Sequence, residues 1–214
     1  KNNHQDSGSY KKFGLMLATS FVVMYAVMFL NADLFDHIYL SNTVASSLAI
    51  TGTTTLTNSS SGATSYIYLG NTGDVTLNSS LNIVNASTGT TGNTYVGAAD
   101  GSVVTIAGNT TVTNSGGSTT KRVYLGDQGD VTFNGTLAIT NNSTATNSQV
   151  YCNNGTNSTN VYDQNITIES TSSSNDGVLF GNSSGTGTLA ATRTISIGGG
   201  GYIGTGLTFR NFTQ

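Results

Sequence analysis

The stretch Arg122-Val-Tyr-Leu-Gly126 recurs along the chain in closely similar forms. When the copies are aligned on the tyrosine, the spacings are 27, 29, 27 and 28 residues, at Tyr68, Tyr95, Tyr124, Tyr151 and Leu179. A fixed period of this length is typical of an array of stacked structural repeats. One such unit cannot bury its apolar face alone, so each unit is expected to pack against the next.

Within each unit, apolar residues alternate singly with polar ones, as in Val131-Thr-Phe133 and Leu137-Ala-Ile139. This period of two predicts short, half-buried strands and not helices. Three strands per unit follow, and their turns contain residue types that tolerate positive φ, at Gly73-Asp74, Asp100-Gly101 and Gly129-Asp130.

We therefore predict an all-β fold over residues 46–214, a parallel β-helix or solenoid with coils of about 28 residues and three strands each. Crossover chirality favours a right-handed coil. A β-sandwich also consists of short strands and turns and is the structural alternative. Near-identical phrases at one period argue against a sandwich, because its strands lie in unlike environments.

The alternation also predicts which residues point into the solenoid. The first strand of each unit supplies the inward pairs Ile67/Leu69, Thr94/Val96, Val123/Leu125, Val150/Cys152 and Val178/Phe180. The third strand supplies Leu81/Ile83, Thr110/Val112, Leu137/Ile139, Ile166/Ile168 and Ile195/Ile197.

Terminal repeats normally carry a polar cap. None is evident at Phe212-Thr-Gln214, so we expect the array to continue past Gln214.

Residues Phe13–Leu30 form a run of eighteen residues without a charge. This length matches a membrane-spanning or signal-anchor helix, for which roughly 17 to 25 residues are usual. Lys11 and Lys12 precede the run, so the positive-inside rule places residues 1–12 in the cytoplasm and the repeats outside, with residues 31–45 as a linker. The alternative is a cleaved signal peptide, whose apolar part is normally about 7 to 15 residues long and ends at a small-x-small site.

Two parts of the sequence resemble known proteins. Lys11–Leu30, continuing through Asp36-His-Ile-Tyr-Leu-Ser41, resembles the first membrane span of a family of small bacterial membrane proteins of unknown function. The family's Met- and His-rich portion has no counterpart after Ser41, so no metal role is implied. Phrases such as Val131-Thr-Phe-Asn-Gly135 are similar to the repeats of large secreted bacterial surface proteins, which implies an exported location.

The outward tyrosines of the first strand, Tyr68, Tyr95, Tyr124 and Tyr151, are the best candidates for a ligand-binding surface. Neighbouring strands lie about 4.7 to 4.9 Å apart, so these rings are also expected to stack and to stabilise the array. Both roles stay open at this point.

The other reactive side chains favour structural roles. Cys152 is the only cysteine and aligns with inward Leu69, so we interpret it as a buried core thiol and not as a nucleophile. A second set consists of acidic residues that we expect to stack at one turn, namely Asp74, Asp100, Asp127 and Asp130. The nonapeptide calcium repeat is missing, so turn formation is favoured over calcium binding, and no metal or cofactor is expected.

Catalysis is disfavoured by the arrangement of the charged residues. β-Helix enzymes that abstract a proton need a base close to groups that stabilise an anion. The basic side chains Lys121, Arg122, Arg193 and Arg210 do not fall in one file, and Glu169 is the only glutamate. The chain has seven Lys and Arg in all, a net charge of −3 and no basic patch, so a nucleic-acid partner is not expected.

These observations predict a non-enzymatic, exported surface protein whose solenoid acts as a stalk or an adhesin-like scaffold. Its expected partners are a surface polysaccharide or another cell surface, and the membrane through Phe13–Leu30. The alternative is an ice-binding or polysaccharide-binding module. Three threonine-rich phrases support it, at Thr53-Thr-Thr55-Leu-Thr57, Thr111-Val-Thr113 and Thr192-Arg-Thr194.

Overall fold

The computed structural model describes residues 28–31, 37–171, 177–204 and 206–214, and all regular structure in these ranges is β-strand. The strands form three sheets of seven strands, and the chain visits the three sheets in turn, one strand in each per coil. Every strand pairing is parallel, as between residues 54–58 and 81–85. The fold is therefore the predicted parallel β-solenoid, and the β-sandwich alternative is wrong.

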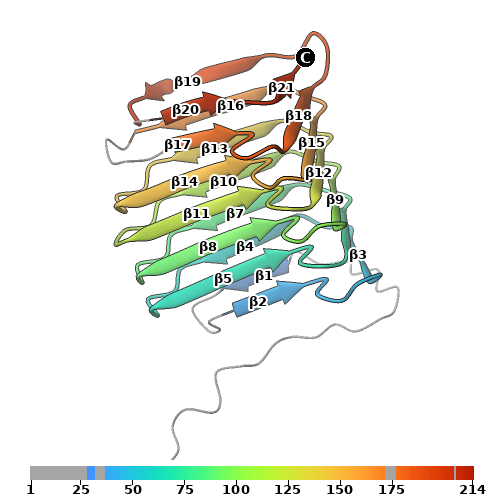
Figure 1. Cartoon of the computed structure of the whole chain (residues 1–214). Coiled ribbons are helices and arrows are strands. Elements are labelled where there is room, and N and C mark those ends of the chain that lie inside the picture. The colour runs from blue at the N-terminus through green and yellow to red at the C-terminus, as the bar shows by residue number, and fades with distance from the viewer. Residues whose placement is uncertain (1–27, 32–36, 172–176, 205) are drawn as a thin grey trace, which may run out of the picture.

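Each sheet takes every third strand of the chain. Sheet 1 contains β1 (Met28–Asn31), β4 (Thr54–Asn58), β7 (Leu81–Asn85), β10 (Thr110–Asn114), β13 (Leu137–Asn141), β16 (Ile166–Ser170) and β19 (Ile195–Tyr202). Sheet 2 contains β2 (His37–Leu40), β5 (Thr64–Leu69), β8 (Thr91–Val96), β11 (Thr120–Leu125), β14 (Asn147–Cys152), β17 (Gly177–Phe180) and β20 (Gly206–Phe209). Sheet 3 contains β3 (Ser47–Ile50), β6 (Asp74–Leu77), β9 (Val103–Ile106), β12 (Asp130–Phe133), β15 (Thr159–Tyr162), β18 (Thr186–Leu189) and β21 (Phe212–Thr213). Figure 1 shows the coils stacked from β2 to β20.

The two predicted inward files are confirmed. In sheet 2, Val123 pairs with Thr94 on one side and Val150 on the other, and all three are buried. In sheet 1, Ile139 pairs with Val112 and Ile168. These side chains are at most 1% exposed. The last strand of sheet 1 is the exception, because Ile195 is half-buried and Ile197 is 46% exposed.

The corner from sheet 2 to sheet 3 begins with a left-handed residue in each coil except the last, where Arg210 takes this position. Gly70, Gly97 and Gly126 have φ of 68°, 64° and 77°, a region in which a Cβ is disfavoured. The prediction that Gly73 and Gly129 supply positive φ was wrong. Those two glycines are needed for close approach instead, because a Cβ on Gly129 would lie 2.1 Å from Ser102 Oγ of the preceding coil.

The solenoid begins earlier than the predicted boundary at residue 46. β2 falls within the predicted linker and pairs in register with β5, with Tyr39 opposite Tyr68. β1 contains the last three residues of the predicted membrane helix and pairs with β4, so that end of the helix was predicted wrongly. Residues 13–27 lie outside the described residues. Among the residues that the structure describes, no helix is long and apolar enough to span a bilayer.

A file of buried asparagines lies where sheet 1 turns into sheet 2, at Asn58, Asn85, Asn114 and Asn141. Asn85 Nδ2 donates to Asn114 Oδ1, and Asn114 Nδ2 donates to Asn141 Oδ1, both at 3.0 Å. Asn114 Nδ2 also lies 3.1 Å from the Lys121 carbonyl oxygen and 2.9 Å from Ser148 Oγ. The file therefore joins successive coils inside the core.

Lys121 is a cation within this core, because its side chain points inward and is 0% exposed. Its Nζ donates to the carbonyl oxygens of Gly89 at 2.7 Å and Thr120 at 3.0 Å. Burial lowers the pKa of this amine. Gly116 provides the room, because a Cβ there would lie 2.8 Å from Lys121 Cδ. In three other coils a buried serine takes the position of Gly116, namely Ser60, Ser87 and Ser143.

Candidate functional site

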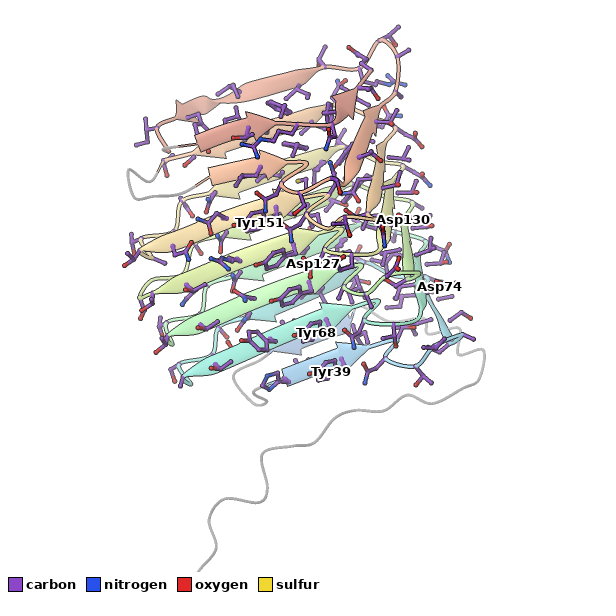
Figure 2. All side chains as sticks on the ribbon, in the orientation of Figure 1. Tyr39, Tyr68, Asp74, Asp127, Asp130 and Tyr151 are labelled. Atoms are coloured by element: carbon purple, nitrogen blue, oxygen red, sulfur yellow. The ribbon has the colours of Figure 1, made fainter. Side chains whose placement is uncertain are left out.

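The four predicted tyrosines form one continuous outward file on sheet 2, and Tyr39 extends it by one coil. The pairings Tyr39–Tyr68, Tyr68–Tyr95, Tyr95–Tyr124 and Tyr124–Tyr151 are all in register. Their ring centroids are separated by 4.7, 4.7, 4.6 and 5.0 Å, and each pair lies within 10° of parallel. Figure 2 shows the file crossing the strands of sheet 2 from Tyr39 to Tyr151. We call these five residues the tyrosine ladder.

Stacking decides which part of each ring can meet a ligand. The interior rings contact a neighbouring ring on both faces, so their faces are largely covered. The ladder side chains are half-buried, apart from Tyr124, which is 8% exposed. Stacked aromatic pairs stabilise by roughly 0.5 to 1.5 kcal/mol each beyond the area they bury. The predicted stacking role is therefore confirmed, and what remains for a ligand is a row of ring edges and hydroxyls.

A second outward file runs beside the ladder and donates hydrogen bonds to it. In register order it contains His37, Tyr66, Asn93, Arg122 and Gln149. Asn93 Nδ2 donates to the Tyr95 hydroxyl at 3.1 Å, and Arg122 Nη1 lies 3.4 Å from the Tyr124 hydroxyl. Arg122 Nε donates to Gln149 Oε1 at 3.0 Å. The first two residues of this file, His37 and Tyr66, are aromatic, and the three that follow, from Asn93 to Gln149, are polar.

Three phenols of the ladder have a raised pKa. Burial raises the pKa of Tyr68 to about 12, and the neighbouring Tyr39 and Tyr66 add to the rise. Burial also raises the pKa of Tyr95 and Tyr124, against the hydrogen bonds from Asn93 and Arg122 that lower it. At neutral pH these three phenols are therefore uncharged and can donate and accept hydrogen bonds.

The ladder is expected to make the fold sensitive to alkaline pH. Tyrosines of an unfolded chain ionise near pH 10, whereas Tyr68 keeps its proton up to about 12. Because the folded state holds this proton more tightly, its contribution to stability is complete below about pH 10 and is lost as the pH rises towards 12. An ultraviolet absorbance titration with parallel circular dichroism should show late phenol ionisation coupled to loss of β-structure.

The control for that titration is Tyr68→Phe, which removes the group with the raised pKa and keeps the ring. This variant should lose its β-structure at a higher pH than the unmodified chain. Full ionisation near pH 10 in a chain that keeps its β-structure would contradict the expected coupling.

The acidic residues do not form the single stack that the sequence suggested. Asp74 and Asp130 share one register position, but Val103 of β9 lies between them. Each instead accepts a hydrogen bond from the backbone of the next coil, Asp74 Oδ1 from Val103 N and Asp130 Oδ1 from Thr159 N. Figure 2 shows both beside sheet 3, away from Asp127. No cluster of three His, Cys, Asp or Glu that could hold a metal ion occurs among the described residues.

Asp127 lies at the corner that follows the ladder. Its Oδ1 accepts a hydrogen bond from Asn154 Nδ2 at 2.7 Å, and Asn182 Nδ2 donates to Asn154 Oδ1 at 2.9 Å. Burial raises the pKa of Asp127, while the bond from Asn154 lowers it in part. This corner therefore borders the ladder with amides and one carboxyl group.

The remaining candidate residues have structural positions. Cys152 is 0% exposed in the inward file, and burial raises the pKa of its thiol, which confirms the predicted core role. Of the four basic residues, Lys121 is buried, and Arg193 Nε donates to the Asp163 carbonyl oxygen at 3.1 Å. Arg122 is the one that lies beside the ladder.

Comparisons with known protein families, with curated proteins and with solved structures find no match for this chain.

Proposed function

We propose that this protein is a non-enzymatic, adhesin-like bacterial surface protein that binds polysaccharide through sheet 2. The observation that carries the proposal is the tyrosine ladder with Arg122 and Gln149 beside it on one sheet face. A row of neutral hydroxyls, with amide and guanidinium donors alongside, suits a polymer that itself carries many hydroxyls. The net charge of −3 favours a neutral polymer over a strongly acidic one.

The strand β1 bears on how such a protein would be exported. Because Met28–Asn31 pairs with β4, the apolar run available to a membrane is residues 13–27. That is shorter than the roughly 17 residues of a usual span and within the length of a signal-peptide core. This supports the secreted alternative over a permanent anchor. N-terminal sequencing of the exported chain would test it, and a first residue before Phe13 would argue for the anchor.

Binding to insoluble cellulose, chitin and xylan, measured by co-sedimentation with the full chain, tests the proposed ligand class. Arg122→Ala is expected to weaken binding about tenfold, as loss of a hydrogen bond from a charged donor does. Tyr95→Phe keeps the stacked ring and removes one hydroxyl, and it should weaken binding by less. Arg210→Ala removes an exposed cation away from the ladder and serves as the matched control. Equal binding of all variants, or none to any polymer, would refute the proposal.

A second candidate is ice binding through sheet 1. Thr55 and Thr57 of β4 and Thr111 and Thr113 of β10 lie at the outward positions of that sheet, in line with the threonine phrases of the sequence. The phrase at Thr192 lies in a corner, where this residue has φ of 68°. The outward files of sheet 1 are interrupted by residues without a hydroxyl, namely Asn82, Val84, Ala138 and Glu169.

An ice-growth assay separates the two candidates. If sheet 1 is the functional face, the full chain should inhibit ice growth, and Thr111→Val combined with Thr113→Val should abolish the effect while Arg122→Ala does not. Absence of any inhibition, together with polysaccharide binding that depends on Arg122, leaves sheet 2 as the functional face.

A further inference from the structure

The tyrosine ladder places oxidisable rings next to one another in five successive coils. Neighbouring ring centroids are 4.6 to 5.0 Å apart, and strand pairing holds each ring opposite the next. The phenol hydroxyls occupy the same position on parallel rings. The ring carbons beside each hydroxyl are therefore close to the same carbons of the neighbouring ring.

Few other side chains compete with these rings for an oxidant. The chain has no tryptophan, and all three methionines lie at or before position 28. Its single thiol, Cys152, is buried. Tyr162 is 1% exposed, and its ring neighbours are phenylalanines, at Phe133, Phe180 and Phe212. Among the described residues, Tyr66 and Tyr202 are the other half-buried tyrosines, and the ladder therefore offers most of the oxidisable rings on the solenoid surface.

We propose that the tyrosine ladder is a site of oxidative cross-linking, at which neighbouring tyrosines such as Tyr68 and Tyr95 become joined as dityrosine. Each phenol loses one electron and its hydroxyl proton, which gives a phenoxyl radical. The two radicals form one carbon–carbon bond between the ring positions ortho to the oxygens. The hydrogens at those two carbons then move to the oxygens and restore both phenols.

The oxidant is hydrogen peroxide acting through a haem peroxidase. Each link releases two electrons and two protons, and one peroxide takes up both pairs and becomes two molecules of water. The new bond requires two rings to leave the parallel stack and meet at their edges. The outward, half-buried position of Tyr39, Tyr68, Tyr95 and Tyr151 permits this movement.

Each link would join two adjacent coils covalently. Like a disulfide, it would close a loop of the unfolded chain and so favour the folded state. The chain cannot form an internal disulfide, because Cys152 is its only cysteine. The ladder supplies a covalent cross-link of the same kind through tyrosine side chains. Its formation does not depend on which ligand sheet 2 binds.

The test is oxidation of the dilute, purified full chain with a haem peroxidase and hydrogen peroxide. The expected result is dityrosine fluorescence in a species that still migrates as a single chain in a denaturing gel. Mass spectrometry of the digested chain should find peptides joined in pairs from adjacent coils of the ladder. The oxidised chain should also unfold at a higher denaturant concentration than the untreated one.

Each single substitution in the ladder is expected to remove a specific set of dityrosine links. Tyr95→Phe should remove the link Tyr68–Tyr95 and leave Tyr39–Tyr68 intact, whereas Tyr39→Phe should remove only the link Tyr39–Tyr68. Tyr66→Phe is the matched control, because Tyr66 meets Tyr68 and Tyr95 edge-on at 6.1 Å and belongs to no stacked pair. Links only between separate chains, or links that persist in Tyr95→Phe and vanish in Tyr66→Phe, would overturn the proposal.

Discussion

Replacing Ile139 by aspartate is expected to abolish the cooperative unfolding transition of the solenoid. Ile139 is 1% exposed and lies between Val112 and Ile168 in the middle of sheet 1. A carboxylate at this position has no partner, and an unpaired buried charge costs far more than a typical substitution, above about 4 kcal/mol. Because each coil contacts only its neighbours, damage to a central coil also separates the two halves of the array.

Urea unfolding followed by circular dichroism measures this effect, and the adjacent residue provides the control. Ala138 occupies an outward, half-buried position opposite Thr111 and Thr167. Ala138→Asp should therefore change the free energy of unfolding by no more than about 0.5 kcal/mol. Similar losses from both variants would mean that the two faces of sheet 1 are equally buried, which is incompatible with a solenoid that has one interior.

Asn114→Ala is expected to cost about 3 kcal/mol or more of unfolding free energy. The Asn114 amide accepts from Asn85 and donates to Asn141, and all three residues are 0% exposed. Its removal takes one buried hydrogen bond each from Asn85 Nδ2, Asn141 Oδ1 and Ser148 Oγ, at roughly 0.5 to 1.5 kcal/mol for each bond. The measurement is the urea midpoint together with the slope, which should not change if the native state keeps its compactness.

Asn142→Ala is the matched control for this prediction, because Asn142 is exposed and directly follows a member of the same file. Its effect should stay within about 0.5 kcal/mol. Asn114→Asp gives a second comparison, since it keeps an acceptor but loses the donor that faces Asn141 Oδ1, and it should be at least as damaging as Asn114→Ala. An unchanged urea midpoint for Asn114→Ala would show that the file does not hold the coils together.

The files of Ile139 and Tyr124 could be predicted from the sequence because strand geometry imposes a strict period of two. Once one apolar residue is assigned inward, its neighbour must point outward, and the repeat carries that assignment through the array. The same reasoning predicted the stacking of the tyrosines. It missed Tyr39, because β2 follows an apolar run that is typical of a membrane segment, and so the first coil was interpreted as a linker.

The inward polar residues could not be predicted from the pattern. Asparagine after a strand is normally a turn residue, so the period at Asn58, Asn85 and Asn114 carried no sign of burial. Lysine is rarely buried, and Lys121 points inward only because Gly116 leaves room and carbonyl oxygens receive its amine. Two left-handed turn residues were misplaced for a related reason, since the corners at Gly70/Gly73 and Gly126/Gly129 hold two glycines each and the sequence does not reveal which has positive φ. At Gly101 the prediction of positive φ was right.

The pairing of Gly116 with Lys121 affects how the coils align with one another as the chain folds. An array of nearly identical coils has approximate translational symmetry, so a mistake of one whole coil keeps every inward side chain inward and is only weakly penalised. Lys121 breaks this symmetry, because its side chain fits only where Gly116 replaces the buried serine and where Gly89 offers its carbonyl oxygen. In a coil shifted by one repeat, the lysine side chain would meet a serine side chain where the native coil has Gly116. A single lysine thus makes one coil different from the others, so that the native alignment of the coils differs in energy from an alignment shifted by one coil.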